Sequence, residues 1–170
     1  MKKMMMGIVL GALLLGCQEN ESDSGQAEYT GNETVYPLLQ SSDYAVNGTV
    51  TFRERADGST SIVVALTGTE GDIEHPVHLH LGNITTPDAE VAALLNPVPG
   101  KAGTSETQLA QLADETPLSY QEVLALSACI KVHLSASGPD RDIILAAGNI
   151  GAANLDVTTG RSGISVCKSE

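Results

Sequence analysis

Polar and apolar side chains alternate with a period of two in several short segments of the chain, a pattern typical of β-strands with one buried face. Turn signals such as Asp57-Gly58 separate the segments. About seven short strands of this kind predict an all-β fold, an antiparallel Greek-key sandwich or barrel with one short helix. The alternating segments are Tyr44–Arg55, His75–Leu81 and Ala128–Ser135. The β-branched run Ser61–Leu66, the apolar run Ile143–Ala147 and, near the end of the chain, Ile164–Cys167 are the other expected strands.

The middle of the chain lacks this alternation. Ala89–Leu95 is expected to form a short helical turn, and Pro97–Gly103, with its prolines and glycines, a loop. The spacing of Ser119 and Glu122 is that of a capping box, in which each side chain binds the other residue's backbone N–H. It predicts a short helix that ends near Leu126.

The first residues have the pattern of an export signal. Two lysines precede an apolar stretch, Met4–Leu15, that is too short to span a bilayer. Leu-Leu-Gly-Cys at 14–17 resembles the lipobox of bacterial lipoproteins, in which the cysteine receives the lipid. We expect cleavage before Cys17 and a lipid anchor on it, in the bacterial cell envelope, on the periplasmic face of a membrane or at the cell surface. An ordinary secretory signal with a chance cysteine is the alternative.

Composition divides the rest of the chain in two. Residues 17–40 are polar and acidic, and we expect them to form a disordered tether. Residues 41–170 suit one β domain with a single core, and 1–16 are the signal peptide. The net charge of -12 argues against nucleic acid as a partner and favours cations. In an oxidising compartment, Cys129 and Cys167 are expected to form a disulfide.

The histidines are the most informative residues. Three of the four lie in the run from His75 to His80. On a strand, His78 and His80 share a face, with Cα atoms about 6.6 Å apart, while the apolar residues between and beside them take the core face. His133 is placed in the same way on its own strand. If the two strands are neighbours, the three imidazoles converge.

Three neutral imidazoles suit copper or zinc and leave an open coordination position. We expect copper rather than zinc, because the protein is exported, with His78, His80 and His133 as ligands. His75 precedes a proline and is expected to support the ligands or to be merely structural. Cys129 lies about 13 Å along the strand from His133, too far to join the site. A polar strand face that binds no metal is the alternative.

Longer motifs resemble the CHRD domain, first named from chordin. They are His78–Gly82, Pro117–Glu122, Ile130–His133 and Gly148–Ile150, and the resemblance covers roughly 44–151. The run His75–His80 also has the His-x-x-His-x-His spacing of copper/zinc superoxide dismutases. That second resemblance implies a Greek-key barrel (superoxide dismutase-like, as against Ig-like), copper on His78, His80 and His133, and Cys167 as a disulfide cysteine.

The chain also departs from the dismutase pattern. It has no histidine between His80 and His133, so the metal-bridging ligand and the zinc-site histidines are missing. We expect a copper-binding lipoprotein that captures, stores or delivers the metal and has no catalytic residues. A dismutase-like copper enzyme and a metal-free binding module at the cell surface remain the alternatives, and the sequence identifies no protein partner.

Overall fold

The computed structural model describes residues 28–86 and 89–155, which form an eight-stranded fold with little helix. The strands are β1 Tyr29–Gln40, β2 Asn47–Arg55, β3 Thr60–Thr67, β4 Glu74–Leu81, β5 Val91–Pro99, β6 Thr104–Leu109, β7 Ser127–His133 and β8 Ile144–Gly151. The helical elements are α1 Tyr120–Ala125, the 3-10 turn η2 Pro139–Asp142 and α2 Ala152–Leu155. No helix in the described part of the chain is long and apolar enough to cross a membrane.

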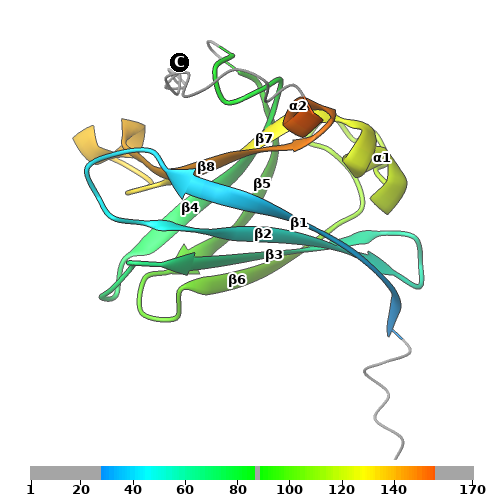
Figure 1. Cartoon of the computed structure of the whole chain (residues 1–170), viewed down its shortest axis with the longest axis horizontal. Helices are drawn as coiled ribbons and strands as arrows, with labels where there is room; N and C mark the ends of the chain where they lie inside the picture. The colour runs from blue at the N-terminus through cyan, green and yellow to red at the C-terminus, as the bar shows by residue number, and fades with distance from the viewer. Residues whose placement is uncertain (1–27, 87–88, 156–170) are drawn as a thin grey trace, which may run out of the picture.

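All strand pairs are antiparallel, in the order β5-β4-β7-β8-β1-β2-β3-β6. Figure 1 shows β1, β2 and β3 running across the front, with β4 and β5 behind them and β8 along the top beside β1. The end strands β5 and β6 meet through side chains: Asn96 N–H donates to Thr107 Oγ1 (2.7 Å), and Asn96 Nδ2 to the Glu106 carbonyl (2.7 Å). The sheet is therefore nearly closed, and the predicted all-β, antiparallel sandwich or barrel is confirmed.

The core lies between the two halves of this barrel and is largely aliphatic. Alternate residues of the strands point inward, among them Val50 and Phe52 of β2 and Val77 and Leu79 of β4, all 0% exposed. The Phe52 ring meets Tyr36 edge to face, with centroids 5.8 Å apart. The strands predicted at 44–55, 61–66, 75–81, 128–135 and 143–147 correspond to β2, β3, β4, β7 and β8.

The predicted tether is wrong over residues 29–40, because these residues form β1. Tyr36 and Leu38 are buried in the core, within the short apolar run Val35–Leu39 that follows a polar segment. Main-chain pairing with β2 runs from Tyr29 to Leu38, and Leu39 and Gln40 pair with β8. The strand therefore forms through pairing with two neighbours and through the two side chains that it adds to the core. Residues 1–27, including the expected signal peptide and lipidated Cys17, lie outside the described residues.

Two further predictions in the middle of the chain are wrong. Ala89–Leu95 does not form a helical turn, because Val91–Pro99 is strand β5, paired with β4. The expected loop at 97–103 is accordingly shorter, and β6 follows it directly. Alanine and leucine favour helices locally, but the open edge of β4 provides hydrogen-bond partners that a helix here would leave unpaired. The last expected strand, at 164–167, lies outside the described residues.

The predicted helix is confirmed as α1. Ser119 is its N-cap: Ser119 Oγ accepts from Glu122 N, and Glu122 Oε2 accepts from Ser119 N (2.8 Å). Tyr120 and Val123 are buried, and the Tyr120 hydroxyl contacts Thr34 Oγ1 of β1 at 2.9 Å. The helix thus packs against the end of the barrel where β1 has left β8 (Figure 1). The four-residue α2 and the turn η2 were not predicted.

Candidate metal centre

The strands that carry the three candidate ligands are neighbours. β4 and β7 pair without interruption from Val77 opposite Val132 to Leu81 opposite Ala128. The apolar residues of both strands enter the core, which leaves the alternate residues on the other face of the sheet. The condition that the sequence left open, adjacency of the two strands, is therefore met.

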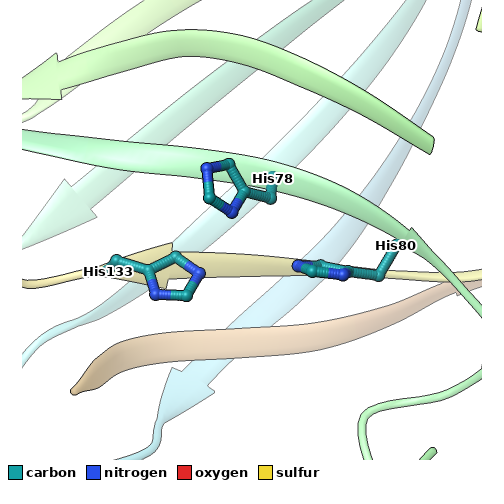
Figure 2. Close-up of side chains that lie close together, drawn as sticks. All are labelled: His78, His80 and His133. Carbon is teal, nitrogen blue, oxygen red and sulfur yellow. The ribbon is translucent and has the colours of Figure 1, made fainter. Parts of the chain in front are cut away.

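His78, His80 and His133 converge on one point. One ring nitrogen of each lies within 4.8 Å of those of the other two. The His78 ring centroid is 4.7 Å from that of His133 and 5.7 Å from that of His80. Figure 2 shows the rings on the same side of β4 and β7. In the part of the chain that the structure describes, this is the only group of three or more such donors.

The strands beside this pair are less regular. On β5, Ala92 is an extra residue between the partners of Leu79 and His80. On β8, Leu145 is an extra residue between the partners of Val132 and His133. Such bulges bend and twist a sheet locally, and they are common beside functional sites. The irregularity thus falls on the flanking strands, while the histidine-bearing strands keep their alternation.

The histidines are buried more deeply than an outward-facing position on a strand would suggest. His80 is 0% exposed and His133 5%, whereas His78 is partly exposed. The segments that follow β4 and β7 supply the cover, since each returns a backbone carbonyl to a ring: Ala89 O lies 2.9 Å from His80 Nδ1, and Arg141 O 2.8 Å from His133 Nδ1. Solvent therefore reaches the cluster from the side of His78.

These two hydrogen bonds fix the tautomers of both rings. A carbonyl oxygen only accepts, so Nδ1–H is the donor in His80 and in His133, and Nε2 carries the lone pair. Nε2 of His133 is buried and has no hydrogen-bond partner among the described residues. A buried, unsatisfied nitrogen is destabilising in a metal-free protein, but it is the atom that a metal ion needs. The donor set therefore fits a metal bound by imidazole.

Electrostatics keep the three rings neutral at pH 7. Burial, with His133 and His80 nearby, lowers the pKa of His78 to about 4. Burial also lowers the pKa values of His80 and His133, with a smaller contribution from the charge on Lys131, while the hydrogen bonds to the carbonyls act in the opposite direction. Neutral imidazole is the form that binds metals.

His75, the predicted supporting residue, is not one of the converging donors. It is buried, and its Nδ1–H donates to the carbonyl of Leu134, the residue after His133, at 3.1 Å. This bond ties the start of β4 to the end of β7, next to one ligand.

Cys129 is not part of the donor group either. It is buried on β7, directly opposite His80. The disulfide predicted between Cys129 and Cys167 stays a prediction, because Cys167 lies outside the described residues.

One residue of the site was missed by the sequence reasoning. Lys131 lies on β7 between Cys129 and His133, opposite His78, and is 0% exposed. The signal that marks it is the same period of two that places His133, since residues 131 and 133 of one strand share a face.

Comparison with known protein families, curated proteins and solved structures found no match for this chain. The resemblances to the CHRD domain and to copper/zinc superoxide dismutases therefore rest on the short motifs described above. The chemistry of the site has to be argued from its own residues.

Proposed function

We propose that this protein is a copper-binding lipoprotein of the bacterial cell envelope that captures, stores or delivers one copper ion held by His78, His80 and His133. The convergence of the three ring nitrogens within 4.8 Å carries the proposal. In His80 and His133, the hydrogen bond from Nδ1–H to a backbone carbonyl leaves the lone pair of Nε2 available to a metal ion. The site is thus pre-organised for a metal.

Copper suits this donor set better than zinc does. Among divalent ions, copper binds nitrogen ligands more tightly than zinc does. Three imidazoles can hold Cu(I) in near-trigonal form, or Cu(II) with an added water. Because either ion can simply be held there, copper binding at this site does not imply catalysis. The partly exposed ring of His78 gives copper a way in, or a partner a way to remove it.

The CHRD-type motifs and the lipobox support the placement of this domain outside the cytoplasm. The histidines of the CHRD-like motifs at 78–82 and 130–133 are the three that converge here. The lipid anchor on Cys17 remains part of the proposal, and it would hold the site close to a membrane.

The test is the metal content and copper affinity of the full chain and of His78→Ala, His80→Ala and His133→Ala. We expect one tight equivalent of copper for the wild type. Loss of an outer-shell partner weakens metal binding 10- to 100-fold, so loss of a ligand should weaken it more than about 100-fold. His75→Ala is the matched control, because it removes a buried histidine of the same strand that is not a donor, and it should still bind one tight equivalent.

The two other functions are outcomes of the same test. If none of the histidine substitutions changes copper binding, the metal site is wrong and a metal-free binding module is favoured. If the copper-loaded protein speeds superoxide decay beyond free copper, the protein is a dismutase-like enzyme. A tight copper complex without that acceleration supports capture, storage or delivery.

A further inference from the structure

A buried lysine lies at the centre of the histidine face. In the register of β4 and β7, Lys131 is directly opposite His78, and His80 is its diagonal neighbour across the two strands. His133 is two residues further along β7, on the same face. Cross-strand neighbours on one face have Cβ atoms about 5 Å apart, and diagonal ones about 7 Å. Lys131 is therefore a neighbour of all three proposed ligands.

The position of Lys131 is unusual for its residue type. Lysine is almost never fully buried without partners, yet this side chain is 0% exposed. Lys131 does interact with other groups of the chain, as a buried ammonium requires. Its place on the same face of the sheet, opposite His78 and two residues from His133, sets its charge beside the site.

A fixed positive charge distinguishes ions by their own charge. The three imidazoles are neutral, and the donor group contains no carboxylate. Repulsion between Lys131 and a divalent ion is twice that for a monovalent ion at the same place. For an effective dielectric constant of about 20 and a charge-to-ion separation of roughly 6–12 Å, one extra unit of charge changes an equilibrium constant by about 10- to 100-fold.

We propose that Lys131 is a specificity-determining residue that makes the three-histidine site select the monovalent ion Cu(I) over the divalent ions Cu(II) and Zn(II). This inference rests on the proposed function and refines it, since it names the ion that the site holds. A site of this kind holds Cu(I) more tightly, relative to Cu(II) and Zn(II), than the same three histidines would without the lysine.

The test replaces Lys131 by a neutral chain of similar length, Lys131→Met, and by a charged one, Lys131→Arg. Affinities are measured by competition with a chelator for each of Cu(I), Cu(II) and Zn(II). Lys131→Met should raise the affinities for Cu(II) and Zn(II) at least tenfold more than that for Cu(I), and Lys131→Arg should keep the wild-type ratios. A tenfold change in the Cu(I)/Cu(II) ratio equals 59 mV in reduction potential. Lys101→Met removes an exposed lysine instead and should leave all ratios unchanged.

Each outcome separates this inference from the proposed function. If the wild type binds copper through the three histidines but Lys131→Met leaves the ratios unchanged, Lys131 is structural and the selectivity inference is wrong. If the wild type binds no copper, the proposed function fails as well. A general loss of stability in Lys131→Met would lower the affinities for all three ions alike, so the ratio of these affinities still reports on the charge of residue 131.

Discussion

We expect His133 to destabilise the metal-free fold, because its Nε2 is buried and has no hydrogen-bond partner among the described residues. A buried polar atom without a hydrogen bond costs about 1–3 kcal/mol. In His133→Leu this cost disappears, and so does the bond to the Arg141 carbonyl, which contributes about 1 kcal/mol. Arg141 is exposed, so water can take over that carbonyl. Metal-free His133→Leu should therefore be as stable as the wild type or up to about 2 kcal/mol more stable.

Copper should reverse this order. At a free concentration about 1,000 times its Kd, a bound ion stabilises the folded state by about 4 kcal/mol. For a domain of this size, that is a rise in Tm of roughly 16 °C. The wild type should show this rise, and His133→Leu should show almost none, because one of its three donors is gone.

Urea and thermal unfolding followed by circular dichroism, with a chelator and then with copper, measure both the unfolding free energy and the Tm. His75→Leu is the control: it loses the hydrogen bond to Leu134 and should lose about 1 kcal/mol, while keeping the stabilisation by copper. A loss of more than about 2 kcal/mol in metal-free His133→Leu would refute the reasoning, since the imidazole would then be needed for packing rather than for a metal.

Four other predictions concern separate parts of the chain. The pKa of His78 is lowered to about 4, so the unfolded chain binds more protons than the folded one between about pH 6.5 and pH 4; the free energy of unfolding of the metal-free protein should fall as the pH drops through this range, and urea titrations showing a flat profile would contradict this. Gly82 has φ +88, and an added Cβ would lie 2.5 Å from Thr86 Oγ1, so Gly82→Ala should lower the unfolding free energy by about 1–3 kcal/mol, and an unchanged Tm would exclude this strain. Ser119→Ala removes the helix cap and should lower stability by about 1 kcal/mol without changing copper affinity, as calorimetry and competition titration would show. Cys17→Ser should abolish incorporation of labelled palmitate in cells, and an unlabelled wild type would show that the chain is not a lipoprotein.

The local pattern of the sequence determined most of the strands and the helix. A period of two predicts β2, β4 and β7 because one face of each strand must enter the core while the other does not. A β-branched run predicts β3, and a continuous apolar run predicts β8. The capping box at Ser119 predicts α1 because it satisfies backbone N–H groups within four residues. The same period placed His78, His80 and His133 on the faces opposite the core. All of this information lies in residues close together in the chain.

Pairing between strands that are far apart in the chain could not be predicted from these local patterns. The strand β1 has a polar first half and forms because β2 and the end of β8 offer it hydrogen bonds. The strand β6 is largely polar, with only its last residue, Leu109, buried in the core, and it forms against the edge of β3. In β5 the helix propensity of alanine and leucine yields to pairing with β4. Propensity is a weak preference, and a free sheet edge outweighs it.

The site shows the same division. The sequence supplied three histidines on suitable faces, but their convergence depended on β4 and β7 being neighbours in a particular register. Their burial, the carbonyls of Ala89 and Arg141 that fix two rings, and the central place of Lys131 follow from the connections that fold back over the sheet and from the pairing of the strands. Residue types and spacing determine which groups can bind a metal, whereas only the tertiary structure decides which of them meet, because convergence depends on contacts between residues far apart in the chain.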